Sequence, residues 1–403
     1  MMRKIRAFML VFLLLIGFYS LRAFDATPER LVLNWSGDPA TTAAVTWRTR
    51  KPAAESMAQI QPASPSPLSP AGAVVVKAVS SPLDTGGNET VWTHSASFTG
   101  LQPDTLYAYR VGSQKHWSEW NQFRTAAAGS RAFRFIFLGD LQNDLASQCG
   151  RVVRASVLQA PDALFMLHAG DLVSRAWQDD QWGEWFTAGE WIYRSIPQLM
   201  VPGNHEYRWA HPVQPTDLTP LWRPHFTLPE NGPAGLEETA YTLDIQGMRL
   251  VALNPNAAVA EQAAWLDRVL REKRTGPWTV LLMHQPLYST GRNRDNRELR
   301  EHLLPVIDSH GVDLVLQGHD HTYGRTYRLR AGRRVRSPKG GTVYVVSVAG
   351  PKQYPLNPLH RSLMARMIAD RQLYQVIHVD HARLRFDAWT ADGVHFDYFE
   401  LRR

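Results

Sequence analysis

The pattern of hydrophobic and polar positions changes near residue 130. From about residue 27 to residue 125, short apolar runs at 31–35, 43–47 and 105–111 are separated by turn residues. This spacing predicts an antiparallel β sandwich. The stretch 61–70 between these runs is rich in Pro and Ser and cannot contribute to a packed core, so we expect a solvated loop there.

Beyond residues 126–130, apolar strand-like runs alternate with helical stretches, which is typical of an α/β layered domain. Five of these runs, at 134–138, 163–167, 198–201, 279–283 and 312–316, each end just before a polar cluster. Because α/β sheets hold ligands at the carboxyl ends of their strands, we expect these clusters to meet at one edge. Near the C-terminus, 373–379 and 382–389 alternate as two antiparallel strands that we expect to close the sheet of this domain.

The first residues have the layout of an export signal. A basic start at 1–6 precedes an apolar run at 7–19, and Ala23 is a small residue suited to cleavage, although Leu21 fits the preceding position poorly. We therefore expect a signal peptide at 1–23, with an uncleaved anchor as the alternative, then a β domain at 27–126 and an α/β domain at 131–403. The expected location is secreted, periplasmic or extracellular, without stable membrane association unless the leader is uncleaved.

Charge and cysteine content narrow the possible partners. Of the formal net charge of +7, four positive charges lie in the leader, which leaves a balance ordinary for this size. We therefore predict no nucleic-acid partner. The single cysteine, Cys149, cannot form an intrachain disulfide, and its apolar surroundings predict a buried residue.

The polar clusters supply carboxylate, amide and imidazole groups. Two cations a few ångströms apart need a shared anionic oxygen and such a mixture of donors. Two histidines at i and i+2 after a strand can direct one imidazole to each ion. Donors of this kind suit iron, zinc and manganese alike, so we predict two metal ions per chain of undetermined identity. The candidate ligands are Asp140, Asp171, Asn204, His284, His319 and His321.

In this order, the motifs GD at 139–140, GD at 170–171, GNHE at 203–206, a lone histidine and GHDH at 318–321 resemble the calcineurin-like metallophosphoesterase superfamily. The similarity is closest to its purple acid phosphatase branch, since residues 99–111 resemble a fibronectin type III corner and 226–233 resemble that branch's linker. The resemblance implies a fibronectin type III-like all-β sandwich followed by a two-sheet β sandwich flanked by helices. It also implies an acid phosphatase-like enzyme acting on small phosphomonoesters, with phosphodiesters as the alternative.

The same resemblance assigns roles. Asp140, Asp171 and His321 would hold the first metal, and Asp171, Asn204, His284 and His319 the second, with Asp171 as the bridge. A metal-bound water, its pKa lowered to about 7, would be the nucleophile. His205 would give a proton to the leaving oxygen or a hydrogen bond to the phosphoryl group.

Three departures from the branch qualify these roles. Ser174 stands where purple acid phosphatases have a tyrosine, so we expect no tyrosinate-to-iron colour. Gln142 stands where many relatives have a histidine, and it either reaches the first metal or bonds to backbone. The stretch 289–297 lacks the usual histidines. We expect either that Arg292 or Arg294 binds phosphate there, or that both belong to a solvated run of charged residues.

Two further interpretations stay open. Glu206 and Tyr207 either support the site from behind the ligands or cap the following segment. The acidic and aromatic stretch 177–186 has helical spacing, and we expect its carboxylates to form a solvated face. A different class of function, a non-catalytic surface-binding protein with a structural metal, fits an open two-metal layout less well.

Overall fold

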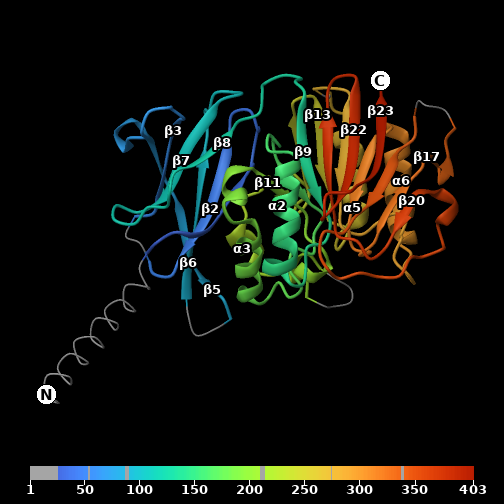
Figure 1. The fold of residues 1–403 in the computed structure, drawn as a ribbon, viewed down its shortest axis with the longest axis horizontal. Helices are drawn as coiled ribbons and strands as arrows, with labels where there is room; N and C mark the ends of the chain where they lie inside the picture. Colours follow the sequence, from blue (N-terminus) through green and yellow to red (C-terminus); the bar gives the residue numbers. More distant parts are fainter. Residues whose placement is uncertain (1–25, 53–54, 87–89, 209–213, 274, 337–339) are drawn as a thin grey trace, which may run out of the picture.

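The computed structural model describes residues 26–52, 55–86, 90–208, 214–273, 275–336 and 340–403. An N-terminal domain of two four-stranded sheets lies beside a larger domain built on a six-stranded and a seven-stranded sheet (Figure 1). The predicted order of an all-β domain followed by an α/β domain is confirmed. The leader predicted at 1–23 lies outside the described residues.

Every strand pair of the N-terminal domain is antiparallel. One sheet has the order β1-β2-β6-β5 and consists of β1 (Glu29–Asn34), β2 (Ala43–Thr49), β5 (Val79–Asp84) and β6 (Thr90–Phe98). The other has the order β4-β3-β7-β8 and consists of β3 (Met57–Pro62), β4 (Val74–Lys77), β7 (Leu106–Gly112) and β8 (Asn121–Arg124). The apolar runs at 31–35, 43–47 and 105–111 thus form β1, β2 and β7, as predicted.

The six-stranded sheet has the order β11-β10-β9-β21-β22-β23. Its parallel part consists of β9 (Phe133–Leu138), β10 (Met166–His168) and β11 (Gln198–Met200). Its antiparallel part consists of β21 (Leu373–Val379), β22 (Arg383–Thr390) and β23 (His395–Arg402). The predicted C-terminal strand pair is therefore confirmed, and β21 extends the catalytic sheet by pairing with β9.

The seven-stranded sheet has the order β12-β13-β14-β15-β19-β16-β20. Its strands are β12 (Tyr241–Ile245), β13 (Met248–Ala252), β14 (Trp278–Leu282), β15 (Leu314–Gln317), β16 (Tyr323–Thr326), β19 (Val343–Val346) and β20 (Met364–Ile368). The neighbours β13, β14, β15 and β19 are parallel and fully buried, as expected for strands covered on both faces. A hairpin of β17 (Leu329–Arg330) and β18 (Arg333–Arg334) lies beside this sheet.

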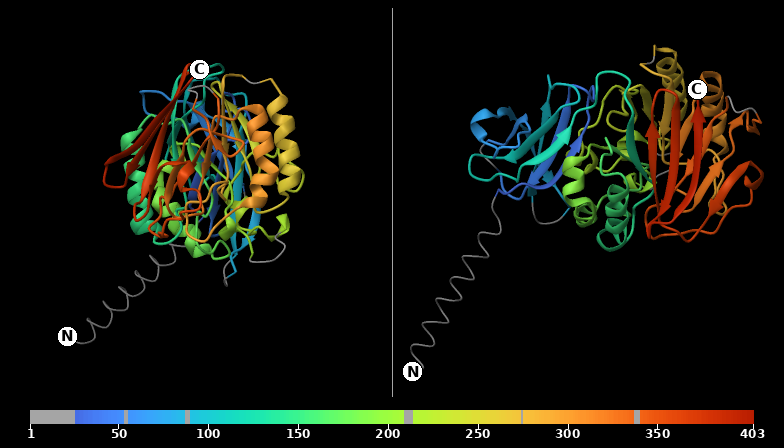
Figure 2. Two further views of the ribbon diagram at one scale, coloured as in Figure 1. Left: turned by 90° about the vertical axis from the view of Figure 1, so that its right-hand side faces the viewer. Right: turned by 45° about the horizontal axis from the view of Figure 1, so that its top comes forward.

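Helices cover the outer sides of the two sheets. The π-helical turn η2 (Leu145–Cys149), with its buried cysteine, leads into α2 (Gly150–Gln159), which packs on β21 and on α3 (Asp179–Ser195). On the opposite side, α5 (Val259–Arg271) packs on α6 (Arg297–His310); Figure 2 shows the sheets between these two helix layers. Short α4 (Trp222–His225) follows β11. Across the described ranges, no helix is long and apolar enough to cross a membrane.

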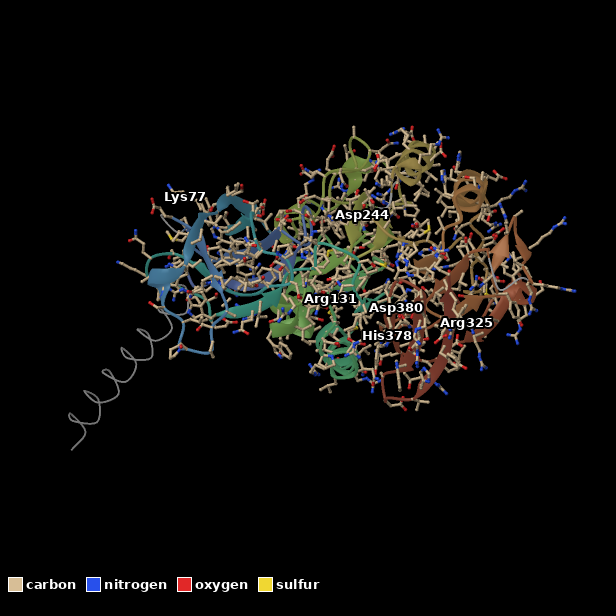
Figure 3. All side chains as sticks on the ribbon, turned by 90° about the horizontal axis from the view of Figure 1, so that it is seen from above. Lys77, Arg131, Asp244, Arg325, His378 and Asp380 are labelled. Carbon is tan, nitrogen blue, oxygen red and sulfur yellow. The ribbon has the colours of Figure 1, made fainter. Side chains whose placement is uncertain are left out.

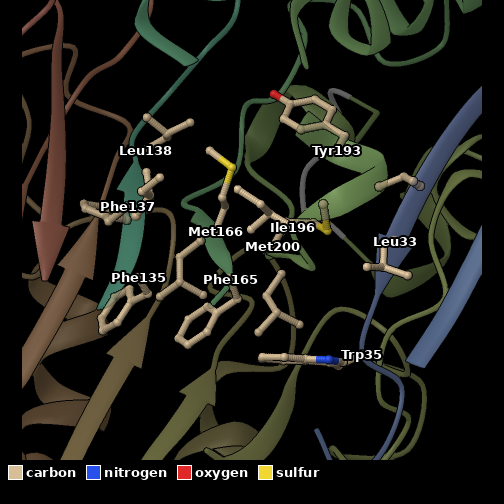
Figure 4. Packing of buried hydrophobic residues seen from close by; sticks show 14 of the residues in the cluster. Leu33, Trp35, Phe135, Phe137, Leu138, Phe165, Met166, Tyr193, Ile196 and Met200 are labelled. Carbon is tan, nitrogen blue, oxygen red and sulfur yellow. The ribbon is translucent and has the colours of Figure 1, made fainter. Parts of the chain in front are cut away.

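One continuous hydrophobic core joins the two domains. The Trp35 ring lies 5.5 Å from the Phe165 ring, and Leu33 faces Met200 and Ile196 (Figure 4). Beside this contact, the Asn34 Nδ2 donates to the Gln198 carbonyl over 2.7 Å. The N-terminal domain is therefore packed against the strands that lead to the candidate site.

Asp179, at the start of α3, forms the charged part of the same interface. Its carboxylate accepts from Arg30 Nη1 at 2.7 Å and from Arg48 Nη1 at 2.8 Å, and Arg48 also bonds Glu29 at 2.6 Å. The prediction that the carboxylates of 177–186 form a solvated face is therefore wrong for Asp179. Helical spacing shows which side chains point away from the core of the helix's own domain. It cannot show that another domain covers those side chains.

Candidate metal centre

The predicted ligands follow the carboxyl ends of parallel strands, as expected, but these strands belong to two sheets. Asp140, Asp171 and Asn204 follow β9, β10 and β11 of the six-stranded sheet. His284 follows β14, and His319 and His321 follow β15, in the seven-stranded sheet. A parallel bridge between Asp140 and Val348 joins the ends of the two sheets. The site therefore lies where the two sheets meet.

All six side chains come together: five form two groups that share Asp171, and Asn204 adjoins one of them at His284. Asp171, His284 and His319 form one group, and Asp140, Asp171 and His321 form the other, with the ligand atoms of each group within 4.8 Å of one another. His284 Nε2 lies 3.3 Å from Asp171 Oδ1 and 3.2 Å from Asn204 Oδ1. His321 Nε2 lies 3.3 Å from Asp140 Oδ2. The two groups correspond to the two ligand sets that the sequence resemblance implied, with Asp171 common to both.

Hydrogen bonds fix which ring nitrogen faces the centre. His284 Nδ1 lies 2.7 Å from the Ala169 carbonyl oxygen, and His321 Nδ1 lies 2.9 Å from that of Lys352. Because a carbonyl oxygen only accepts, both Nδ1 atoms carry a hydrogen, and both Nε2 atoms face the centre, where a metal could take the place of any proton on them. Metal-binding histidines have this arrangement. Asp140 Oδ2 is buried and has no hydrogen-bond partner among the described residues, so the donor set fits two cations.

The electrostatics of the centre also favour positive ions. Burial raises the pKa of Asp140 to about 7, and the charge of Asp171 contributes to this rise against the opposing effect of His284. Burial would lower the pKa of His284, but Asp171 and Asp140 raise it to about 9. Burial, followed by the charge of Lys352, lowers the pKa of His321 to about 3. Buried carboxylates that draw a proton onto a neighbouring imidazole will also draw a metal cation.

Three ligands have strained backbones. Asp171, His319 and His321 have φ angles of 48°, 72° and 51°. A non-glycine residue in the left-handed region costs about 1 kcal/mol or more, and such strain clusters at functional sites. We attribute the strain here to the sharp turns that direct these side chains back over the strand ends.

Two glycines of the sequence motifs are required by close contacts. A Cβ atom at Gly203 would lie 2.1 Å from Asp171 Oδ1, and one at Gly318 would lie 2.2 Å from Asp140 Oδ1. Any side chain at either position would push a carboxylate out of the centre. The glycine before the asparagine and the glycine before the paired histidines thus make room for ligands from other strands.

Glu206 holds the ligand loops together from behind. Its buried carboxylate accepts from the backbone N–H of Gly203 at 2.7 Å, of Asp171 at 2.9 Å and of Leu172 at 3.0 Å. These bonds connect the loop after β10 to the turn η3 (Asn204–Glu206). Of the two interpretations of Glu206, support of the ligands is therefore the one the contacts favour. Tyr207 lies further back, where its hydroxyl accepts from Asn254 Nδ2 at 2.6 Å.

His205 lies at the open side of the centre. Its Nδ1 donates to the Ser174 carbonyl oxygen over 2.6 Å, and its Nε2 is 3.9 Å from Asp171 Oδ2. The side chain is 30% exposed, so solvent or a substrate can reach Nε2. The Ser174 hydroxyl is buried and forms no hydrogen bond within the described part of the chain.

Gln142 bonds to side chains, which neither interpretation from the sequence included. Its Nε2 donates to Asp171 Oδ2 over 2.6 Å, and its Oε1 accepts from Lys352 Nζ over 3.1 Å. The amide therefore links the bridging carboxylate to an ammonium group. Its role as a metal ligand stays a prediction.

The two candidate arginines differ in position. Arg292 is exposed, and its backbone N–H bonds the Pro355 carbonyl. Arg294 is partly buried; its guanidinium donates to the His319 carbonyl and lies 3.4 Å from Asp320 Oδ1. Asp320 Oδ2 in turn accepts from Gly291 N–H over 2.9 Å. Only Arg294 therefore touches a ligand loop.

Sequence reasoning missed the loop after β19. Lys352 orients His321 through its carbonyl, and the Tyr354 ring lies 4.8 Å from the His321 ring. Lys352 follows His321 by 31 residues, outside any motif, and only the pairing of β19 with β15 and β16 brings it to the site. No sequence signal marks it.

Comparison with known proteins agrees with this architecture. The sequence matches the family profile of the purple acid phosphatase N-terminal domain over residues 28–125 and that of the calcineurin-like phosphoesterase over residues 133–323. The profiles follow one another in the order of the two domains.

The relatives are distant in sequence, but their alignments cover most of this chain. An uncharacterized protein of Mycobacterium tuberculosis is 28% identical over 343 residues, which is 73% of this chain and 64% of that protein. The chain thus spans just under two thirds of this relative. Acid phosphatase type 7 of Homo sapiens is 27% identical over 370 residues, covering 82% of this chain and 80% of the human protein.

A solved structure, that of purple acid phosphatase PPD1 from yellow lupin seeds, superposes with a TM-score of 0.80. It covers 94% of this chain and 75% of the lupin chain at 18% sequence identity, so the two share their fold. With both family profiles and this shared architecture, the chain belongs to the calcineurin-like metallophosphoesterase superfamily, in its purple acid phosphatase branch.

Proposed function

We propose that this protein hydrolyses phosphomonoesters at a two-metal centre formed by Asp140, Asp171, Asn204, His284, His319 and His321. The observation that carries the proposal is the pair of ligand groups that share Asp171. A shared carboxylate is what two closely spaced cations require, whereas a structural site has one closed shell. The family membership supports the same reaction class.

The bound cations would act as Lewis acids and would supply a water-derived nucleophile at neutral pH. The chain's own residues then position the ligand loops and protonate the leaving oxygen. Glu206 fixes the loops of Asp171 and Asn204 through backbone hydrogen bonds. His205 keeps a hydrogen on Nδ1 through Ser174, so Nε2 of this partly exposed side chain is the ring nitrogen that would exchange a proton with the leaving oxygen.

The donor atoms suit iron, zinc and manganese alike. Ser174 occupies the position where the branch has its tyrosine. We therefore expect the iron-loaded protein to lack a tyrosinate-to-iron absorption band. A visible charge-transfer band that disappears when a tyrosine such as Tyr354 is changed to phenylalanine would contradict this expectation.

We further propose that the protein acts outside the cytoplasm on small phosphoesters, without nucleic-acid partners. The leader-like residues 1–23 support export, and the single cysteine means that no intrachain disulfide accompanies it.

The first experiment combines metal content with activity. We expect about two metal ions per chain in the purified protein and hydrolysis of p-nitrophenyl phosphate faster than of bis(p-nitrophenyl) phosphate. Asp171→Asn should lose metal and roughly 10³-fold or more in activity, because both groups lose their shared oxygen.

Asp180→Asn is the matched control, since this neighbouring-helix carboxylate is exposed and lies outside both ligand groups. It should retain metal and activity. A wild type without metal, or an Asp171→Asn variant as active as the control, would refute the proposal, and a faster diester would reassign the substrate.

A further inference from the structure

Lys352 places an ammonium group at the edge of the metal centre. Its Nζ donates to Gln142 Oε1 over 3.1 Å, and Gln142 Nε2 donates to the bridging Asp171 over 2.6 Å. The Nζ also lies 5.5 Å from the centre of the Tyr354 ring. The ammonium is thus one amide group away from the carboxylate that both ligand groups share.

Lys352 and Arg294 differ in the groups that lie near their positive charges. Both cations flank Tyr354, with the Arg294 guanidinium carbon 5.0 Å from that ring. Arg294 has a carboxylate, Asp320, within 3.4 Å. The contacts of the Lys352 ammonium among the described residues are an amide oxygen and an aromatic face. Lys352 therefore carries a positive charge that a bound anion is free to pair with.

Backbone hydrogen bonds fix the loop that carries this ammonium relative to the candidate ligands. Ala349 and Gly350 donate their N–H groups to the Asp140 carbonyl at 3.1 and 2.7 Å. Further along the loop, the Lys352 carbonyl accepts from His321 Nδ1, and Tyr354 N–H donates to the His321 carbonyl at 3.1 Å. The loop that presents Lys352 is tied on both sides to first-metal ligands, so little backbone entropy is lost when the ammonium meets a ligand.

We propose that Lys352 binds a non-bridging oxygen of the substrate phosphate and makes the centre prefer phosphate dianions over monoanions. This inference rests on the proposed phosphoesterase function. In this chain the stretch 289–297 has no histidine, and of its two candidate arginines Arg292 is exposed and Arg294 faces Asp320, whereas the Lys352 ammonium faces no carboxylate among the described residues. A phosphomonoester carries a second negative charge above a pH of about 6, which a diester lacks. An ammonium without a carboxylate partner attracts the dianion more strongly.

The test compares Lys352→Met, which keeps the length and removes the charge, with Lys352→Arg, which keeps the charge. For Lys352→Met at pH 7.5 we expect kcat/KM for p-nitrophenyl phosphate to fall about 10- to 100-fold, the range for one charge-assisted hydrogen bond. The inhibition constant of inorganic phosphate should rise by a similar factor. The loss for bis(p-nitrophenyl) phosphate should be several-fold smaller, and Lys352→Arg should recover most of both. Below pH 6 the monoester defect should shrink, because the substrate loses its second charge.

Lys77→Met is the matched control, since Lys77 is an exposed lysine on β4 of the distant N-terminal domain (Figure 3). It should behave as the wild type. Equal losses for monoester and diester, or no recovery in Lys352→Arg, would overturn the inference and leave Lys352 a purely structural residue. Metal content in every variant separates the two proposals. If the wild type holds two metals and has normal activity while Lys352→Met is unaffected, only the role of Lys352 is refuted.

Discussion

Two groups of buried carboxylates in this protein are balanced in opposite ways. At the domain interface, Asp179 accepts hydrogen bonds from Arg30 and Arg48, and Arg48 also pairs with Glu29. At the metal centre, Asp140, Asp171 and Glu206 are buried without a single arginine or lysine ion pair among the described residues. Their partners are imidazoles, backbone N–H groups and the neutral side-chain amide of Gln142.

The contrast shows how a structural charge cluster differs from a cation site. Burial would raise the pKa of Asp179, but Arg30 and Arg48 outweigh it and hold the pKa below its ordinary value. For Asp140, burial dominates and raises the pKa to about 7. A cluster whose charges already match contributes to folding, whereas one with unmatched negative charge is completed by a cation.

The strongest test of this contrast is Asp140→Asn. The amide oxygen can still accept from His319 N–H, now 2.6 Å from Oδ1, and the new NH₂ can donate to His321 Nε2, now 3.3 Å from Oδ2. We expect activity to fall roughly 10³-fold as the first metal loses its carboxylate. The metal-free variant, however, should be about 1 kcal/mol more stable than the metal-free wild type, because a buried charge is replaced by a hydrogen-bonded neutral group.

Urea unfolding after treatment with a chelator measures this difference. A metal-free Asp140→Asn protein that is clearly less stable than the metal-free wild type would place Asp140 with the structural carboxylates and remove the contrast.

His205→Ala tests the chemistry of the same centre without altering a ligand group. The imidazole Nε2 is the exposed proton carrier in the proposed mechanism, and its loss should lower kcat about 10²-fold. Because the backbone N–H of residue 205 still donates to Asp171, metal content should not change. A decrease in bound metal that accounts for the lost activity would show that His205 supports the ligands instead.

Asp179→Asn tests the other side of the comparison. It removes the carboxylate that Arg30 and Arg48 share, whose side chains are 11% and 8% exposed, and leaves Glu29 as the carboxylate partner of Arg48 and the residue 179 carbonyl as the acceptor for Arg30. We expect a loss of about 2 kcal/mol in the free energy of unfolding, less than for a fully buried pair because Asp179 retains 17% exposure. Activity per folded molecule should not change. Asp180→Asn, one residue further and exposed, should have an effect below about 0.5 kcal/mol.

The effect of Asp179 should also depend on pH in a defined direction. A carboxyl group with a depressed folded pKa stabilises the protein above its unfolded pKa of about 3.9, and this contribution is lost as the pH falls through the folded value. The difference between wild type and Asp179→Asn should therefore be constant from pH 5 to 8 and shrink below about pH 4. A difference that grows on acidification would exclude the ion pairs as its cause.

The sequence predicted the parts of the site that local pattern determines. An apolar run followed by a glycine and a ligand occurs at Asp140 and at Asp171, and again before Asn204 and before His319, so strand ends and ligands could be read together. The close contacts at Gly203 and Gly318 explain why these motifs contain glycine. The six candidate ligands could therefore be proposed from spacing and resemblance.

What the sequence could not predict depends on contacts between distant segments. Nothing near Asp179 indicates Arg30 and Arg48, which are 149 and 131 residues away. Nothing near Gln142 indicates Lys352, which is 210 residues away. Such pairs form only after two domains or two sheets have packed, and no local periodicity encodes which partner is met.

The smallest expected effect separates the two arginines of one charge run. Arg294 donates to the His319 carbonyl and lies beside Asp320, so Arg294→Ala should loosen a ligand turn and lower kcat/KM about fivefold, which corresponds to the roughly 1 kcal/mol of one ordinary hydrogen bond. Arg292 is exposed, so Arg292→Ala should change kcat/KM and phosphate inhibition by less than about twofold. Steady-state kinetics with p-nitrophenyl phosphate and inorganic phosphate measure both. A larger loss in Arg292→Ala than in Arg294→Ala would mean that the exposed arginine grips the phosphate, and the unmatched charge of Lys352 would then no longer be needed to explain substrate binding.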